Sequence, residues 1–484
     1  MPFDLPIQQH DLLIDGKRVA AASGRYFETL DPSTEQVIAH IAEADAADVD
    51  AAVRSARAAF EGPWGQMRAA DRGLLLLKLA DLIRQNQDEL VQLESLDSGK
   101  PVSAARRQDL PAVIDTLTYY AGWADKINGQ VIPARPDALT YTVREPMGVV
   151  GAIIPWNFPL MIGMWKIAPA LACGCTVVLK PAELTPLTAL RIGELALEAG
   201  LPPGTLNVVP GFGRTAGQAL VDHPDVDKVT FTGSPGVGRQ ILHGAAGNLK
   251  RVTLELGGKS ANIIFPDADL DSAVKAAGAG IFFNTGQVCS AGSRILAHRD
   301  VYDEVVERLV ARAKAVRMGD PRDAATSMGP LISAGQMKRV LDYIDVGAGE
   351  GAKVATGGAR HGEAGYYVAP TVFAGVEHEM RISQEEIFGP VAAVIPFDSD
   401  EDALRLANGT TYGLAAGVWS ADIGRVHRFT RRLRAGTVWV NTFGPTDVRL
   451  PWGGARDSGF GREHGDAAIE NFTEPKVVWI NTGR

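Results

Sequence analysis

One cysteine of this chain lies where a thiol can reach a ligand. Cys289 stands in a loop of small and polar residues, 282–294, after a helical pattern at 269–281 and before an apolar segment at 295–297. Loops held between regular elements commonly carry reactive groups, and the thiolate is a strong nucleophile. The loop alone leaves a second interpretation open, because unpaired cysteine is also a common small buried hydrophobe.

A second stretch has the pattern of a phosphate-binding turn. Residues 229–232 read as a strand, and Gly233, Ser234 and Pro235 then open a helix with favourable N-terminal residues. Free N–H groups at a helix start attract a pyrophosphate. The spacing G-x-x-G-x-G differs from the usual dinucleotide fingerprint, so a tight turn without a ligand stays open. Lys180 and Glu183 follow the expected strand at 176–179. Two interpretations are open there: the pair binds the hydroxyl groups of a sugar, or it belongs to a solvated turn.

Four further side chains are candidates for acid–base or oxyanion chemistry. Glu255 stands between two leucines at the end of an apolar strand, so it is either paired structurally or placed for proton transfer. Asn157 follows a buried strand between aromatic residues, where an amide stabilises an oxyanion or organises its own loop. Glu385 and Glu386 precede an apolar turn, and at least one of them is expected to be solvated.

No metal site is expected. Cys173 and Cys175 form a Cys-x-Cys pair in an apolar run, but no further ligand pattern follows, so both read as packing residues. The nine histidines show no metal or triad spacing. His243, His298 and His464 read as surface or packing residues.

Strands and helices alternate from residue 149 onward, which predicts a doubly wound α/β sheet. Buried-strand patterns cover 149–154, 176–179, 206–209, 229–232, 252–256 and 263–265. The clearest helix between them has Thr185 as N-cap, Pro186 at its first position and Gly200 as its stop. A second α/β unit follows Cys289, with strands at 391–397, 414–419 and 437–441 and helices at 301–316 and 401–408. Its boundary is expected near 250–260.

The first third of the chain reads as helical, and two strand-like arms stand apart. Helical patterns end at Gly62 and Gly99, and a leucine-rich one covers about 71–86. The segments 140–143 and 476–480 read as strands with little core of their own. We expect them to pair with other strands, including those of another subunit.

Composition excludes several classes of protein. The chain has 484 residues, of which 46% are hydrophobic and 22% charged, as in globular proteins of two or three domains. A net charge of −9 argues against nucleic acid as the main partner. The small number of cysteines, three, indicates a reducing compartment. We find no secretory signal and no apolar run long enough to span a membrane, so we expect a cytoplasmic protein without a membrane partner.

Taken together, these motifs resemble those of the aldehyde dehydrogenase superfamily, in its NAD-linked hydrolytic branch. The matching pieces occur in order along nearly the whole chain: PWNFP at 155–159, KPAE at 180–183, FTGS at 231–234, LELGGK at 254–259, residues 283–294, EEIFGP at 385–390, PWGG at 451–454 and SGFGR at 458–462. No one motif is decisive, but their sequence is specific.

The resemblance implies roles for the catalytic residues. Cys289 is expected to attack the aldehyde, with the Asn157 side chain and the Cys289 N–H holding the oxyanion. Glu255 is expected to activate the water that releases the acid from the thioester. Glu463 matches a position sometimes assigned to proton relay.

The resemblance also implies an NAD site. Lys180 and Glu183 are expected on the adenosine ribose, and Glu183 favours NAD over NADP because a carboxylate repels the extra phosphate. Ser234 and Gly233 are expected near the pyrophosphate. The remaining expected contacts come from Trp156, from Glu386 on the nicotinamide-side ribose and from Phe388 beside the nicotinamide.

The implied fold is two doubly wound α/β domains with a β-strand oligomerisation arm. The expected ranges are 1–126 and 147–256 for a Rossmann-like dinucleotide-binding domain, 257–458 for the catalytic domain, and 127–146 with 470–484 for the arm. The expected assembly is a homodimer or homotetramer.

The substrate is the least determined part of the expectation. The residues expected in or beside the tunnel are Phe158, Ile162, Trp165, Phe283, Val288, Ser290, Phe443, Thr446, Asp447 and Trp452. Their apolar and aromatic character favours a medium-chain or aromatic aldehyde. Betaine aldehyde, held by cation–π contact, is the second candidate. Two other classes stay open: a CoA-acylating enzyme, against which Glu255 argues, and a catalytically silent binding protein.

Overall fold

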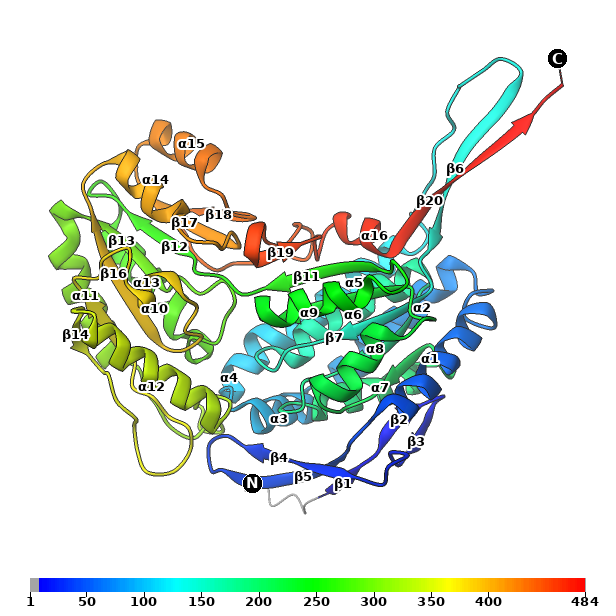
Figure 1. Ribbon diagram of the computed structural model, residues 1–484, viewed down its shortest axis with the longest axis horizontal. Coiled ribbons are helices and arrows are strands. Elements are labelled where there is room, and N and C mark those ends of the chain that lie inside the picture. The colour runs from blue at the N-terminus through cyan, green and yellow to red at the C-terminus, as the bar shows by residue number, and fades with distance from the viewer. Residues whose placement is uncertain (1–7, 484) are drawn as a thin grey trace.

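The computed structural model describes residues 8–483 and has two lobes with a protruding arm (Figure 1). The first lobe is built on an eight-stranded sheet. In spatial order its strands are β19 (Gly459–Phe460), β11 (Arg251–Leu256), β10 (Lys228–Gly233), β7 (Val149–Ile153), β8 (Thr176–Lys180), β9 (Leu206–Val208), β2 (Leu12–Ile14) and β3 (Lys17–Val19). The five strands from β11 to β9 are parallel.

Helices cover both faces of this sheet. They are α1 (Ala46–Glu61), α2 (Ala69–Gln85), α3 (Gln87–Ser98), α4 (Val102–Ala104), α5 (Leu110–Trp123), α6 (Pro159–Cys173), α7 (Leu187–Ala199), α8 (Gln218–Asp222), α9 (Pro235–Ala245) and α16 (Ala467–Phe472). Every residue of β7 and β8 is buried, because apolar clusters lie on each side of the sheet. Such two-sided burial explains why these strands read as continuous apolar runs.

The second lobe is built on a seven-stranded sheet. In spatial order its strands are β14 (Lys353–Thr356), β15 (Thr371–Ala374), β16 (Val391–Phe397), β13 (Arg294–His298), β12 (Ala261–Ile264), β17 (Ala415–Trp419) and β18 (Thr437–Val440). Its helices are α10 (Leu270–Phe282), α11 (Tyr302–Lys314), α12 (Ala334–Gly349), α13 (Arg381–Gln384), α14 (Asp400–Asn408) and α15 (Ile423–Arg432). Apolar clusters again fill both faces. The expected fold, two doubly wound α/β units with a strand arm, is confirmed.

The strand order of the first sheet reverses between β7 and β10. The chain runs from β7 through β8 to β9 on one side, and then returns to place β10 and β11 on the other side of β7. Open α/β sheets bind ligands outside the carboxyl ends of the strands at such a reversal. The residues that follow β7 and β10 therefore surround the expected ligand crevice.

The two sheets meet at opposite strand ends. Residues 257–260 lead directly from the carboxyl end of β11 to the amino end of β12. Because β12, β13 and β16 are parallel, their amino ends share that edge. The loop with Cys289 precedes β13 and Glu386 precedes β16, so both face the crevice of the first sheet.

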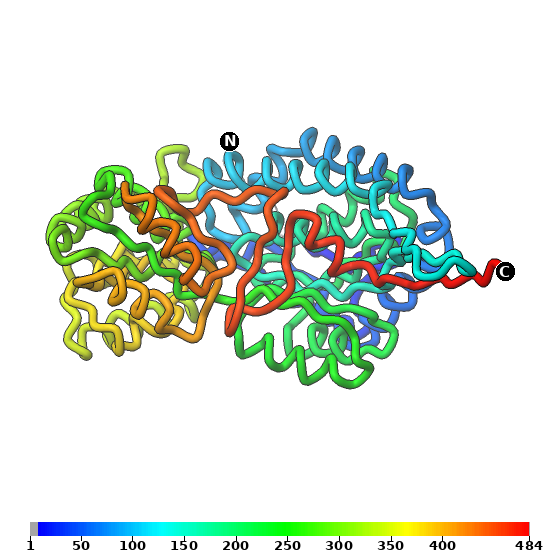
Figure 2. Tube along the Cα trace, turned by 90° about the horizontal axis from the view of Figure 1, so that it is seen from above, coloured from blue at the N-terminus to red at the C-terminus, as the bar shows by residue number. Residues whose placement is uncertain are grey.

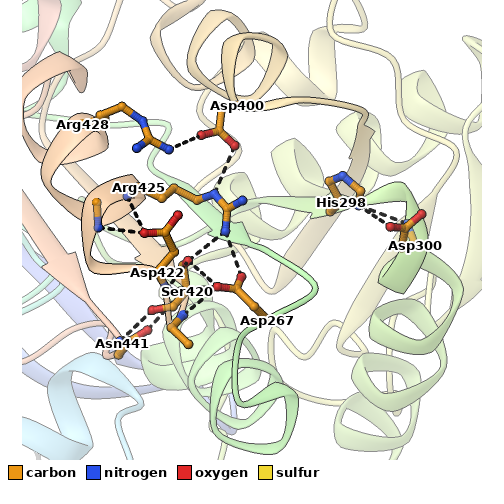
Figure 3. Close-up of polar contacts among 11 residues, drawn as sticks. Asp267, His298, Asp300, Asp400, Ser420, Asp422, Arg425, Arg428 and Asn441 are labelled. Atoms are coloured by element: carbon orange, nitrogen blue, oxygen red, sulfur yellow. Dashed lines mark hydrogen bonds and ion pairs between the residues drawn. The ribbon is translucent and has the colours of Figure 1, made fainter.

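An ion-pair network fills the other end of the second sheet (Figure 3). Arg425 of α15 lies 3.1 Å from carboxylate oxygens of both Asp267 and Asp400, and its guanidinium packs 4.3 Å over the ring of Phe265. Asp267 also accepts a hydrogen bond of 2.8 Å from the Ser420 hydroxyl. These contacts join the loops after β12 and β17. Side chains of the protein itself thus occupy the carboxyl ends of these strands.

The arm is a two-stranded ribbon of β6 (Ala138–Pro146) and β20 (Thr473–Asn481). Figures 1 and 2 show it projecting from the first lobe, with the C-terminal segment crossing between the lobes to reach it. Trp479, Val477 and Ile480 of β20 are exposed on it. The two strand-like segments therefore pair with each other, and pairing with another subunit stays a prediction.

The helices expected in the first third agree with α1, α2 and α3, but the strands of this region were not predicted. A three-stranded sheet of β1 (Gln8–His10), β5 (Gln36–Ala42) and β4 (Tyr26–Asp31) lies there, and β2 extends the first sheet through Leu13 beside Val208. Several of these strands have only three residues, which is too short for a periodic pattern.

The expected start of α7 was wrong. Pro186, not Thr185, occupies the N-cap, and the buried Thr185 hydroxyl has no partner among the described residues. The Asp97 carboxylate accepts a hydrogen bond of 2.9 Å from Leu187 N, so a residue far away in sequence caps the helix. Gly200 does end α7, with a φ of 98°. Among residues 8–483, no helix has the length and apolar character needed to cross a membrane.

Candidate active site

A cavity of about 330 Å³ lies where the two sheets meet. It combines residues that follow β7, β10 and β11 with residues from the Cys289 loop, from α12 and from the segment before β16. The lining residues are Pro155, Trp156, Asn157, Thr232, Gly233, Ser234, Pro235, Leu256, Gly257, Cys289, Gln336, Arg339, Glu386, Phe388 and Tyr412. The topological reversal of the first sheet therefore does hold a cavity, and Cys289 lies in its wall.

A strained turn carries Cys289 into this cavity. After α10, Asn284 and Thr285 both have left-handed backbone angles, with φ of 47° and 56°. This conformation is unfavourable for a β-branched residue such as threonine. The Thr285 hydroxyl donates to Gly329 O at 3.0 Å and holds the turn. A Cβ on Gly286, whose φ is 70°, would lie 2.0 Å from Gly389 O, so the turn packs too closely for any other residue.

The Cys289 thiol is half-buried, whereas Cys173 and Cys175 are buried. Desolvation raises the pKa of the Cys289 thiol above its ordinary value, and the carboxylates of Glu255 and Glu386 raise that pKa further. At neutral pH the group is therefore a thiol. Its proton must leave for the sulfur to act as a nucleophile.

Asn157 is fixed beside the Cys289 loop. Its buried side-chain Nδ2 donates to Gln287 O at 2.9 Å, and its backbone O accepts from Asn284 Nδ2 at 3.0 Å. A primary amide carries two N–H groups, so one of them stays available for another acceptor. Because Asn157 also lines the cavity, that donor is placed to meet an oxygen near Cys289.

Glu255 is buried at the end of β11, and it does not line the 330 Å³ cavity. Its Oε1 accepts a hydrogen bond of 3.2 Å from Gly454 N. Burial raises the pKa of Glu255 to about 8, and the nearby Glu463 carboxylate also raises it, while Lys166 lowers it. A carboxyl group with such a pKa can exchange a proton near neutral pH.

A buried ion pair lies behind Glu255. Lys166 of α6 bonds to Glu463, and its Nζ also donates to the Thr230 hydroxyl at 3.2 Å. The second carboxylate oxygen of Glu463 has no partner among the described residues. The sequence thus brings two carboxyl groups and one ammonium group together from β11, α6 and the segment after β19.

The start of α9 borders the same cavity. The Ser234 hydroxyl caps α9 by accepting from Val237 N at 3.4 Å, and Pro235 occupies the first turn, as the sequence predicts. Gly233 lets the backbone pass the Phe231 ring, which would lie 2.4 Å from an added Cβ. The partial positive charge of the helix start therefore faces the cavity.

Glu386 and Phe388 form the opposite wall. The Glu386 Oε1 accepts from Gly258 N at 3.0 Å, and an added Cβ on Gly257 would lie 2.0 Å from Glu386 Oε2. Phe388 has a φ of 62° and packs edge-on against Trp156, with ring centroids 5.2 Å apart. The Gln336 amide donates to Phe388 O at 2.8 Å and so stabilises this backbone.

Lys180 and Glu183 lie just outside the cavity wall. They are joined at 3.4 Å, and Lys180 pairs in register with Ile153 of the central strand β7. Lys180 is buried, which lowers its pKa, and Glu183 is partly exposed. Because β8 is adjacent to β7, the Lys180–Glu183 pair lies beside the residues that follow β7.

The expected tunnel residues divide into two groups. Trp165, Thr446 and Asp447 line a second cavity, of about 420 Å³, together with Tyr119 and His464. The others pack around the Cys289 loop or in the core next to it: Phe158, Ile162, Phe283, Val288, Phe443 and Trp452. Phe158 and Phe283 lie 6.0 Å apart between ring centroids. Ser290 is buried beside Cys289.

Sequence reasoning missed four residues that the structure brings to these sites. They are Lys166, Gln336, Arg339 and Tyr412. A lysine in the otherwise apolar run of α6 was a usable signal for Lys166. His464 was expected at the surface or in packing, and its burial against the Trp165 ring, with centroids 4.3 Å apart, agrees with packing. Gln336, Arg339 and Tyr412 had no local signal.

The chain is similar to known proteins over nearly its whole length. The aldehyde dehydrogenase family profile matches residues 19–478. A putative aldehyde dehydrogenase of Bacillus subtilis is 52% identical over 471 residues, which are 97% of this chain and 95% of that protein. Cytosolic aldehyde dehydrogenase 1 of Rattus norvegicus is 50% identical over 478 residues, covering 98% and 95%.

Solved structures agree with this relationship. An aldehyde dehydrogenase from Bacillus cereus, in its NAD⁺ complex, is 52% identical and superposes with a TM-score of 0.97 over 98% of this chain and 97% of that one. An indole-3-acetaldehyde dehydrogenase complexed with NAD⁺ is 46% identical, with a TM-score of 0.97 over 99% and 97%. The family expected from the sequence motifs is confirmed: this chain belongs to the aldehyde dehydrogenase family.

Proposed function

We propose that this aldehyde dehydrogenase oxidises an aldehyde to its carboxylic acid with NAD, through a thioester on Cys289 that Glu255-activated water hydrolyses. One observation carries the proposal: a single cavity has the start of α9 at one side and the Cys289 thiol with the Asn157 amide at the other. The first side suits a pyrophosphate and the second suits attack on a carbonyl.

The residues present fit NAD. Gly233 and Gly257 keep the crevice open, because an added Cβ at either position would collide with Phe231 or Glu386. Thr232, which precedes Gly233 in the wall, has a buried hydroxyl with no partner among the described residues. Glu183 next to Lys180 favours NAD over NADP by charge. When bound, NAD supplies the acceptor for the hydride that leaves the substrate carbon.

The first half-reaction forms a bond between Cys289 sulfur and the aldehyde carbon. The thiol gives its proton to solvent water, the sulfur bonds the carbonyl carbon, and the carbonyl oxygen becomes an oxyanion. The second N–H of Asn157 and the Cys289 backbone N–H donate to that oxyanion. Loss of hydride from the thiohemiacetal then leaves a thioester on Cys289. The fixed position of Asn157 means that these donors need little reorganisation.

The second half-reaction needs a base. Ionised Glu255 takes a proton from water, the resulting hydroxide attacks the thioester carbon, and the carbon–sulfur bond breaks to release the acid and the Cys289 thiolate. A pKa of about 8 makes Glu255 an effective proton acceptor on the alkaline side of neutrality. Lys166 and Glu463 extend the set of buried groups that can exchange that proton.

The substrate class we propose is an aromatic or medium-chain aldehyde, because the residues around the Cys289 loop are apolar and aromatic. One structural relative is an indole-3-acetaldehyde dehydrogenase, which supports the aromatic choice. Betaine aldehyde is the second candidate, since Trp165 and Trp452 lie with ring centroids 6.4 Å apart and indole rings attract cations.

Three wider expectations stay proposals. We assign residues 1–126 and 147–256 to the dinucleotide-binding domain, 257–458 to the catalytic domain, and 127–146 with 470–484 to the arm. The assembly we propose is a homodimer or homotetramer joined through the ribbon of β6 and β20. The exposed apolar residues of β20 support such joining. A cytoplasmic location is supported by the rat relative, which is named as cytosolic, although an Arabidopsis thaliana relative is named as mitochondrial.

The test is the stoichiometry of oxidation by the wild-type enzyme. With phenylacetaldehyde and NAD, we expect steady NADH formation matched by phenylacetic acid, and no change when CoA is added. Formation of an acyl-CoA would instead assign the chain to the CoA-acylating class. Absence of NADH with aromatic, aliphatic and betaine aldehydes, with either NAD or NADP, would favour a silent binding protein.

A further inference from the structure

A buried group of charges lies next to the Asn157 segment, and the proposed reaction does not use it. Lys100, between α3 and α4, bonds to Asp109, and its Nζ lies 3.6 Å from Glu94 Oε1. None of these three residues, the Lys100 cluster, has more than 1% of its surface exposed. Apolar side chains would fill such a space at least as stably as an ion pair, so the cluster requires another explanation.

The Lys100 cluster contains two carboxyl groups and one ammonium group. Burial raises the pKa of Glu94 to about 7 and also raises the pKa of Asp109, while Lys100 lowers both. Asp109 and Glu94 also hydrogen-bond to each other, which requires a proton on one of them. At neutral pH the cluster is therefore an ammonium, a carboxylate and a carboxylic acid, with no net charge.

The ammonium group of Lys100 packs on the ring of Phe158. Its Nζ lies 4.1 Å from the ring centroid. The attraction of a cation to an aromatic face is strongest where water is excluded, as it is here. Phe158 directly follows Asn157 and is the residue before the first turn of α6. Lys100 therefore holds the ring next in sequence to the amide that we place at the oxyanion.

Glu94 reaches the same helix start. The Leu160 N–H, in the first turn of α6, hydrogen-bonds to the Glu94 carboxyl group. The first N–H groups of a helix have no partner within the helix and need such an acceptor. The Thr188 hydroxyl of α7 donates to the other oxygen, Glu94 Oε2, at 3.2 Å. The Lys100 cluster thus contacts α6 on both sides of Pro159, directly after Asn157.

The residue before Lys100 contacts the support of the Cys289 loop. An added Cβ on Gly329 would lie 2.0 Å from Gly99 O, so these two backbones touch. Gly329 O accepts the hydrogen bond from the Thr285 hydroxyl that holds the strained turn before Cys289. Residues 99–100 therefore contact both sides of the site, the Asn157 segment through Phe158 and the Cys289 turn through Gly329.

We propose that Lys100 is a positioning residue, which fixes the Asn157 amide relative to Cys289 through the Phe158 ring and the start of α6. The inference rests on the proposed function and adds a residue to it. An oxyanion donor contributes only within hydrogen-bond distance of the developing charge, so a small displacement of Asn157 is enough to slow bond formation at Cys289.

A double replacement removes the cation without leaving a charge unpaired. Lys100→Met with Asp109→Asn deletes the ammonium and one carboxyl group together. Glu94 then keeps its proton, because the ammonium that lowered its pKa is absent. The cluster stays neutral, so we expect this variant to fold and to unfold near the denaturant midpoint of wild type.

The measurement is NADH formation in a single turnover, with enzyme in excess over phenylacetaldehyde and NAD saturating. The double replacement should slow this step by about 10-fold, less than the 10²- to 10³-fold expected for Asn157→Ala. The Kd for NAD, from fluorescence quenching, should not change, since no member of the cluster lines the 330 Å³ cavity. Asp125→Asn with Lys126→Met, an exposed ion pair, is the matched control and should react like wild type.

A double-mutant cycle separates positioning from general loosening of the fold. In an Asn157→Ala background no amide remains to be positioned, so the Lys100→Met and Asp109→Asn replacements should slow the step by less than about twofold. The same slowing with and without Asn157 would overturn the inference. An unchanged rate when Asn157 is present would overturn it as well.

A second variant reaches the same contact from the ring. If the double replacement fails to fold, Phe158→Leu leaves the ion pair in place and removes the face on which Lys100 packs. It should slow the step only while Asn157 is present, and an equal effect in the Asn157→Ala background would overturn the inference. Failure of the proposed function would look different, because wild type itself would then form no NADH in a single turnover.

Discussion

Replacing Glu255 by glutamine separates the two halves of the proposed reaction. The amide oxygen of glutamine can still accept from Gly454 N, as Glu255 Oε1 does at 3.2 Å, so the fold around β11 is preserved. The amide cannot take a proton from water. Acylation of Cys289 should therefore continue, while hydrolysis of the thioester should stop.

The size of the effect follows from the buried carboxyl group. Since the pKa of Glu255 is raised to about 8, about one tenth of the sites carry the base form at pH 7 and about nine tenths at pH 9. Wild-type deacylation should thus rise about tenfold between these values and fall as the pH decreases. In Glu255→Gln the rate should be lower by about 10²- to 10⁴-fold and should lose this dependence on pH.

Stopped-flow absorbance of NADH measures both steps at once. Glu255→Gln should release about one NADH per active site in a burst and then nearly cease. Glu474→Gln is the matched control. The Glu474 carboxylate lies outside the site and pairs with Arg251 of β11, the strand that also carries Glu255. A Glu255→Gln enzyme with the turnover and pH profile of wild type would refute the assigned base role.

Three other changes probe the same site. Cys289→Ala should abolish both burst and turnover while NAD still quenches the protein fluorescence, and residual NADH formation would contradict a covalent intermediate on this residue. Gly257→Ala places a Cβ 2.0 Å from the Glu386 carboxylate, so we expect the KM for NAD to rise by about tenfold or more, and an unchanged KM would remove Glu386 from the cofactor site. Lys166→Met leaves Glu463 buried without its cation and should reduce the free energy of unfolding by about 3–5 kcal/mol, measured by denaturant titration. Because Lys166 lowers the pKa of Glu255, the same variant should move the pH profile of turnover above 8; a profile that stays in place would show that the two groups are not coupled.

Local patterns in the sequence predicted much of the fold. The strand at 391–397 agrees with β16 to the residue, and Ser234 with Pro235 marks the start of α9. Both depend on interactions within a few residues, namely two-sided burial and N-capping. The motif order along the chain likewise identified the family, because it summed many weak local signals.

Contacts between distant segments were not predictable in this way. The cap of α7 comes from Asp97, which lies 90 residues before Leu187, so the local candidate Thr185 was preferred wrongly. Lys166 and Glu463 are separated by 297 residues, and nothing near either residue indicates the other. The choice between surface and packing for His464 could not be made locally either, since the residues around it come from α5, α6 and the segment after β18.

The position of β19 has a consequence for how the enzyme is made. Gly459 pairs with Glu255, and Gly454 supplies the hydrogen bond to its carboxyl group, so the strand that carries the base remains an open edge until these residues are synthesised. Domains generally fold from the N-terminus during translation. The ribosome must therefore complete more than nine tenths of the chain before Glu255 is enclosed, and a prematurely terminated product holds its nucleophile without a finished base. Steady turnover therefore requires synthesis beyond residue 459.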